Sequence, residues 1–82
     1  MPQTLSLNVL LFASWADALG STVRVELPAG STVADVLASL SARVSGSALP
    51  TPLVAVNQRY ARPSDRIAVG DEIAIIPPVA GG

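Results

Sequence analysis

The residues that could carry chemistry lie at the C-terminal end of the sequence, which closes on Gly81 and Gly82. The sequence holds no cysteine and no histidine, and all five basic residues are arginines. Thiolate, imidazole and lysine-amine chemistry are therefore excluded, and so are metal sites built on cysteine or histidine. We expect the carboxylate of Gly82 to be the reactive group and the rest of the chain to be a scaffold that presents it.

The segment before the two glycines is suited to extending that carboxylate away from a folded domain. Pro77 and Pro78 fix φ at about −65° and favour an extended exit, and residues 77–82 span at most about 20 Å. Gly81 and Gly82 have no side chains, so the last peptide fits a channel too narrow for a Cβ atom. A frayed terminus or a glycine scar left by cloning would have the same sequence.

Composition limits the class of protein and of partner. The chain is 82 residues long, which predicts a single domain, and its net charge of −1 with singly spread arginines does not suit nucleic acid. There is no signal peptide and no apolar run near the roughly 18 residues that span a bilayer, so we expect a cytoplasmic protein without a membrane partner. Apolar residues make up 50% of the chain, more than a small core hides, which favours an exposed apolar patch and a protein partner.

Hydrophobic alternation predicts an N-terminal hairpin. Residues 5–12 alternate as a strand does and become apolar on both faces at Leu10 and Phe12. An alanine-rich segment ended by Gly20 indicates a short helix. Residues 22–27 alternate again, so the two strands are expected to pair with the short helix in their connection.

One long helix is predicted next. Thr32 followed by Asp35 is an acidic variant of the capping box. Apolar residues at helical spacing follow, and Gly46 is expected to close the helix. Trp15, in the preceding short helix, is expected to pack over the sheet edge.

The C-terminal half predicts short strands around tight turns. Residues 53–56 indicate a strand, Asn57 and Gln58 a tight turn, and residues 59–61 a returning arm. Asp71 and Glu72 precede a last strand. Adjacent residues on a strand point to opposite faces, which argues against a catalytic carboxylate pair.

The C-terminal motif resembles the end of the MoaD/ThiS family of ubiquitin-like sulfur carriers. The molybdopterin synthase small subunits of that family usually end in Gly-Asp-Glu-Val, two apolar residues and Pro-Pro-Val-Ser/Thr-Gly-Gly, and this sequence ends in Gly70-Asp71-Glu72-Ile73-Ala74-Ile75-Ile76-Pro77-Pro78-Val79-Ala80-Gly81-Gly82. Phe12, Ala13 and Gly20 match a second motif, and Val54-Ala55-Val56-Asn57 resembles a third. Ala16 and Ala80 replace the usual arginine and small hydroxyl residue.

The element order, together with the resemblance, implies an α+β protein with the β-grasp, ubiquitin-like fold. We expect a mixed sheet of four to five strands with one main helix across it, a domain at residues 1–76 and an extended tail at 77–82. The resemblance places the first and last strands side by side and parallel. If so, Leu10, Phe12, Ala74 and Ile76 share the sheet face that no second helix covers, with Tyr60 at its border.

The resemblance also implies a function: a sulfur carrier that is the small subunit of molybdopterin synthase and no enzyme on its own. An E1-like enzyme would use ATP to adenylate Gly82, and a sulfur donor protein would supply the sulfur that turns Gly82 into a thiocarboxylate. The large subunit would then use that sulfur to form the molybdopterin dithiolene. No cofactor is expected to stay bound. The expected catalytic residues are Gly81 and Gly82; the expected partner-binding residues are Phe12, Tyr60, Ile76, Pro77, Pro78, Val79 and Ala80.

Two other classes of function stay open. A carrier for thiamine, cysteine or tRNA thiolation, or a ubiquitin-like modifier, would use the same tail. A non-catalytic interaction module would carry the two glycines incidentally. Neighbouring genes would discriminate among the carriers, and a homologue that continues past the glycines would favour the module.

Overall fold

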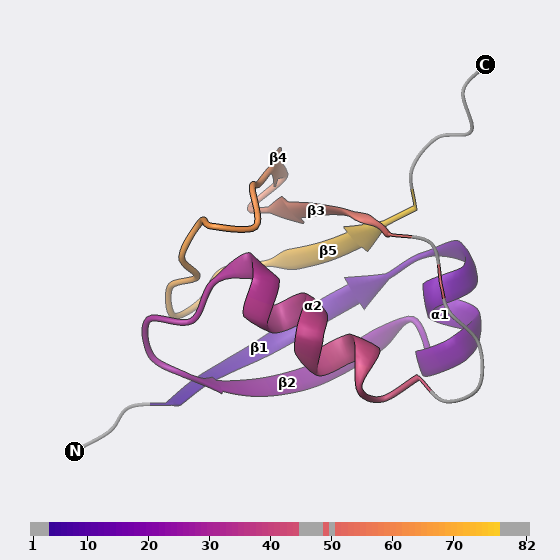
Figure 1. The fold of residues 1–82 in the computed structure, drawn as a ribbon, viewed down its shortest axis with the longest axis horizontal. Coiled ribbons are helices and arrows are strands. Elements are labelled where there is room, and N and C mark those ends of the chain that lie inside the picture. The colour runs from indigo at the N-terminus through magenta and orange to yellow at the C-terminus, as the bar shows by residue number, and fades with distance from the viewer. Residues whose placement is uncertain (1–3, 45–48, 50, 78–82) are drawn as a thin grey trace.

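The fold is a five-stranded mixed sheet with one main helix across it (Figure 1). It is seen in a computed structural model that describes residues 4–44, 49 and 51–77. The strands lie in the order β2-β1-β5-β3-β4. In chain order the elements are β1 (Thr4–Leu11), α1 (Ala13–Leu19), β2 (Thr22–Pro28), α2 (Val33–Ser41), β3 (Leu53–Val56), β4 (Arg59–Tyr60) and β5 (Ile73–Ile76). The predicted α+β class and β-grasp order are confirmed.

The centre of the sheet is the parallel pair β1–β5, which joins the first strand of the chain to the last. Val9 pairs with Ile73, and Leu11 pairs with Ile75. β2 runs antiparallel to β1, and α1 lies in the connection between them, as predicted. Because β1 and β5 run the same way, the end of β5 and the helix α1 lie at the same end of the sheet (Figure 1).

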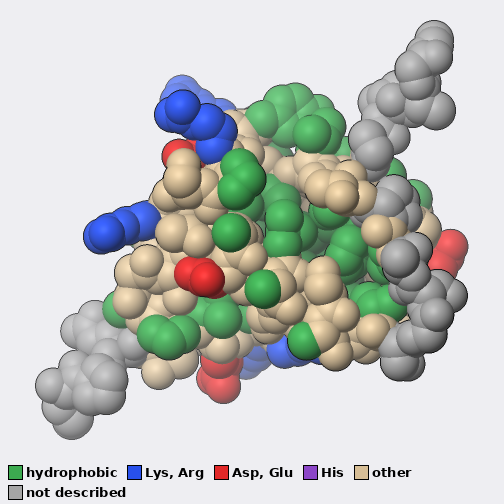
Figure 2. Space-filling view, in the orientation of Figure 1, with side chains coloured by type: hydrophobic (Ala, Val, Ile, Leu, Met, Phe, Trp, Pro, Cys, Tyr) green, Lys and Arg blue, Asp and Glu red, His purple; other side chains and the backbone are tan. Residues whose placement is uncertain are grey.

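The core lies between the sheet and α2. Alternate residues of β1 are buried, and so are Ile73 and Ile75 of β5. α2 adds Val33, Val36 and Leu40, which share one side of the helix. Trp15 is buried in the same core cluster, so it packs inside the core rather than merely over the edge. Figure 2 shows this helix-covered side of the molecule, with hydrophobic side chains at its centre.

The beginning of α2 follows the prediction, but its end does not. The N–H of Thr32 donates to Asp35 Oδ2 at 2.8 Å, and the N–H of Asp35 donates to Thr32 Oγ1 at 3.4 Å, which completes the capping box. The helix ends at Ser41, so the prediction that Gly46 closes it is wrong. After Ser41 the chain tightens into two turns, in which Arg43 N–H bonds to Leu40 O and Val44 N–H to Ser41 O.

The loop before β5 contributes to the core, which the sequence pattern did not predict. Ile67 is buried, and its N–H donates to the carbonyl of Ser31 at 2.9 Å. Arg66 and Thr32 form an isolated antiparallel bridge beside it. These contacts fasten the loop to the beginning of α2.

Candidate functional site

The sheet face opposite α2 carries a shallow apolar hollow beside the end of β5. Strand register places Leu10, Ala74, Ala55 and Tyr60 in one row across β1, β5, β3 and β4. The hollow has a volume of about 350 Å³. Its lining residues are Leu10, Phe12, Ala55, Gln58, Tyr60, Glu72, Ala74 and Ile76.

Small side chains form the floor of the hollow, and large aromatic side chains stand at its margin. Ala55 and Ala74 pair directly, and both carry only a methyl group. Phe12 at one margin is 48% exposed and Tyr60 at the other is 73% exposed. Among the described residues, none covers this face from outside. The predicted uncovered face is confirmed, whereas partner binding by Phe12, Tyr60 and Ile76 stays a prediction.

The backbone after β1 determines where Phe12 points. Phe12 has extended dihedral angles (φ −132°, ψ 154°) and is the N-cap of α1. Ala13 follows with φ of 53°, a left-handed conformation that non-glycine residues seldom adopt and that costs about 1 kcal/mol. The turn at Ala13 takes α1 away from the open face and leaves Phe12 at its margin.

The root of the tail belongs to the same site. Ile76, the last residue of β5, pairs with Leu53 of β3 and lines the hollow. Pro77 follows it and is half-buried. The remaining predicted tail residues, Pro78, Val79, Ala80, Gly81 and Gly82, lie outside the described residues.

Asn57 fastens the start of β5, a role that the sequence analysis missed. Asn57 and Gln58 have φ of 52° and 69° and form the tight turn between β3 and β4, as predicted. The Asn57 side-chain amide donates to Asp71 Oδ1 at 2.9 Å, and its carbonyl oxygen accepts from Glu72 N–H at 3.0 Å. The backbone N–H of Asn57 also donates to the Glu72 carbonyl at 2.8 Å. The resemblance of this asparagine to the third family motif was the available signal.

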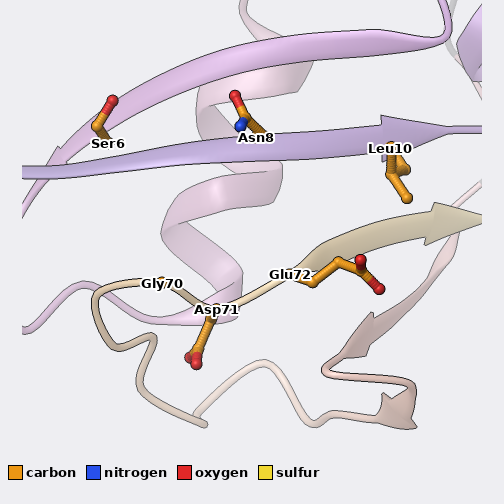
Figure 3. Close-up of a pocket in the computed structure, with 6 residues that line it drawn as sticks. All are labelled: Ser6, Asn8, Leu10, Gly70, Asp71 and Glu72. Atoms are coloured by element: carbon orange, nitrogen blue, oxygen red, sulfur yellow. The ribbon is translucent and has the colours of Figure 1, made fainter.

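The two adjacent carboxylates have different roles, but both precede β5 rather than lie on it, so the predicted separation onto opposite strand faces does not apply to them. Asp71 accepts from Asn57 and, through Oδ2, from Ala68 N–H at 2.8 Å, so it caps the turn before β5. Glu72 points in a different direction, on the side of Leu10 (Figure 3). Both line a second, polar hollow of about 240 Å³ with Ser6 and Asn8 of β1.

The described residues provide neither a cluster of metal ligands nor a membrane-spanning helix. No group of three or more histidine, cysteine, aspartate and glutamate side chains within the described ranges lies close enough to hold a metal ion. The helices of that part of the chain are all too short or too polar to cross a membrane.

Comparison with known proteins gives one consistent family. The sequence model of the ThiS family matches residues 9–82. A molybdopterin synthase sulfur carrier subunit of Chlamydomonas reinhardtii is 39% identical over 83 residues, covering 95% of this chain and 100% of that protein. A protein of the same name from Dictyostelium discoideum is 41% identical over 82 residues, covering 92% and 94%.

Solved structures give the same fold. Small archaeal modifier protein 1 of Haloferax volcanii superposes with a TM-score of 0.77 at 30% identity. The match covers 92% of this chain and 99% of that chain. The similarity therefore spans nearly the full length of the chain, including the strands that form the open face.

Proposed function

The chain belongs to the ThiS family, and from this we propose that it is the sulfur carrier subunit of a molybdopterin synthase. The observation that carries the proposal is the uncovered apolar hollow at the root of the tail. It supplies a docking surface beside the point where Ile76 and Pro77 lead toward Gly82. A subunit with that surface needs a second, large subunit to cover it.

The chemistry takes place on the terminal carboxylate. A carboxylate is a poor electrophile, so an E1-like activating enzyme first uses ATP to convert Gly82 to an acyl adenylate and releases pyrophosphate. Sulfur at the oxidation level of sulfide, delivered by a donor protein, then attacks the acyl carbon and displaces AMP, which leaves Gly82 as a thiocarboxylate. On the large subunit this nucleophilic sulfur attacks the precursor to form the molybdopterin dithiolene, and water cleaves the bond between the acyl carbon of Gly82 and the sulfur, which regenerates the carboxylate. The chain's own part is to dock, to extend the tail and to carry the sulfur.

The scaffold explains how docking and delivery are coupled. β5 pairs with β1 as far as Ile75 and with β3 as far as Ile76, so the strand that leads into the tail is anchored in the sheet. Pro77 and Pro78 stiffen the chain that follows. A partner that covers the hollow therefore receives the tail in a defined direction, and Gly81 and Gly82 enter its active site with no side chain to obstruct them.

Intact-mass measurement of the protein purified from its own cells tests the proposal. Part of the population should be heavier by the difference between one sulfur and one oxygen atom. The increase should map to the C-terminal peptide and be lost when the activating enzyme is deleted. Purified thiocarboxylate should then convert the molybdopterin precursor together with the large subunit. An unmodified C-terminus and an inactive mixture would contradict the proposal.

The structural similarity to small archaeal modifier protein 1 favours a second candidate, a protein modifier. In that case the activated Gly82 would form amide bonds with lysines of other proteins. Tagged chain in denatured, reduced cell extract should then migrate in a ladder of larger products. A single species of monomer size would exclude the modifier and leave the carrier.

A further inference from the structure

Glu72 is the charged residue of the apolar hollow. It is the one ionisable carboxylate or guanidinium among the eight residues that line it, and it also lines the polar hollow beside Ser6 and Asn8. Its side chain is exposed. Among the described residues, no side chain or backbone group hydrogen-bonds to its carboxylate or forms an ion pair with it. Within the described part of the chain, the carboxylate therefore has no compensating partner.

The backbone at Glu72 is nevertheless firmly held. Its N–H donates to the Asn57 side chain, and its carbonyl accepts from the Asn57 backbone N–H. Asn57 is in turn bonded to Asp71, which caps the preceding turn. The position from which the Glu72 side chain extends is thus fixed relative to the hollow, a property that a merely solvated surface glutamate does not need.

Docking changes the surroundings of this carboxylate. A protein that covers the hollow removes water from its lining, and a carboxylate that loses water without gaining a partner strongly disfavours binding. The chain offers no cation of its own among the lining residues, and Arg24 on the same sheet face donates to Ser6 at 2.9 Å. The compensating charge has to come from the partner.

We infer that Glu72 receives an arginine or lysine side chain of the docking partner, and that this pair selects the partner. The inference rests on the proposed function, in which the docking partner is the large synthase subunit. On the partner's surface we expect an apolar side chain that fills the hollow over Ala55 and Ala74, and beside it a cationic side chain that reaches Glu72. Apolar contact supplies affinity, and the charge pair supplies orientation and discrimination.

The experiment compares Glu72→Gln with Glu26→Gln. Glutamine keeps the size of the side chain and removes its charge. Glu26 lies on β2 opposite Ser6, is exposed and lines neither hollow, so it is a matched control on the same sheet face. Affinity for the purified large subunit is measured by calorimetry at low and high salt, and folding is checked by thermal unfolding.

Glu72→Gln should weaken binding about tenfold or more, and its affinity should depend less on salt than that of the natural protein. Glu26→Gln should change the affinity less than about threefold. Glu72→Arg should bind more weakly than Glu72→Gln because it repels the partner's cation. Equal affinity of Glu72→Gln and Glu26→Gln would overturn the inference and leave the proposed function intact. If the natural protein does not bind the large subunit, the proposed function and the inference both fail.

Discussion

Replacing Phe12 with alanine separates a docking residue from a core residue. Burying a phenylalanine fully contributes about 1.5–3 kcal/mol to folding. Because Phe12 is 48% exposed in the free protein, Phe12→Ala should cost about half of that, roughly 1 kcal/mol. For a domain of this size the expected fall in the thermal midpoint is about 4–8 °C. A core phenylalanine would cost about 3–5 kcal/mol instead.

The effect on binding should be larger than the effect on folding. An aromatic anchor in an interface contributes about 2 kcal/mol or more, which corresponds to roughly a 30-fold weaker Kd. Calorimetry with the large subunit and chemical denaturation of the free chain measure the two quantities. Val69→Ala is the control, because Val69 is 80% exposed and does not line the hollow. Unaltered affinity together with a large loss of stability would show that Phe12 is a core residue and refute the reasoning.

Three further predictions concern the tail and its support. Deleting Gly82, or adding one residue after it, should abolish sulfur transfer and leave the thermal midpoint nearly unchanged; full activity of the deletion variant would contradict a terminal reactive group. Gly81→Ala should bind the large subunit normally, but its adenylation or its sulfur transfer should be slow. Pro78→Ala should slow these steps less. A normal rate of sulfur transfer by Gly81→Ala would exclude a narrow channel. Asn57→Ala should destabilise the domain by about 1–3 kcal/mol. It removes two side-chain hydrogen bonds, and it places alanine in a left-handed backbone conformation that asparagine tolerates better. Asn57→Gly accommodates the left-handed backbone, so its loss of stability in the same denaturation assay reports the two missing hydrogen bonds alone. An unchanged free energy of unfolding in both variants would refute the role of the asparagine.

Local pattern predicted most of the scaffold because its elements are encoded over short distances. The strand at Leu53–Val56 has the predicted bounds, and the capping box at Thr32 and Asp35 forms as its spacing indicates. Alternation over residues 5–12 indicated a strand with two distinct faces, and Val9 and Leu11, which share one of them, are both buried. In each case neighbours within one turn or one strand determine the outcome.

Long-range pairing was not encoded locally. Periodicity cannot indicate which strands are neighbours, so the parallel pairing of β1 with β5 came from the family resemblance. Ile67 lies in a loop, yet its side chain is buried in the core cluster, and its N–H bonds to Ser31 far away in the chain. The side chain of Asn57 bonds to Asp71 for the same kind of reason, across a sequence separation of 14 residues. Contacts of this kind appear only when the chain is folded.

Gly46 shows how a strong local signal can be misleading. Glycine after a helical pattern usually ends a helix. Here α2 ends at Ser41, and the turns after it bring the half-buried Val44 against the core. A rule based on one residue could not predict the earlier end of the helix. Val44 stands at helical spacing in the sequence, but in the structure it follows the helix, in a turn.

The two faces of the sheet explain why so short a chain is half apolar. β5 is apolar at every position, with Ile73 and Ile75 under α2 and Ala74 and Ile76 on the other face. A strand that is apolar on both faces requires cover on both faces. The described part of the chain covers only the face that packs against α2. The other is concave, since paired alanines form its floor and Phe12 stands at its margin, so it fits a protruding apolar side chain better than a flat surface. The composition, the apolar residues on both faces of β5 and the shape of the hollow are therefore consistent with the proposal that a partner protein covers this face.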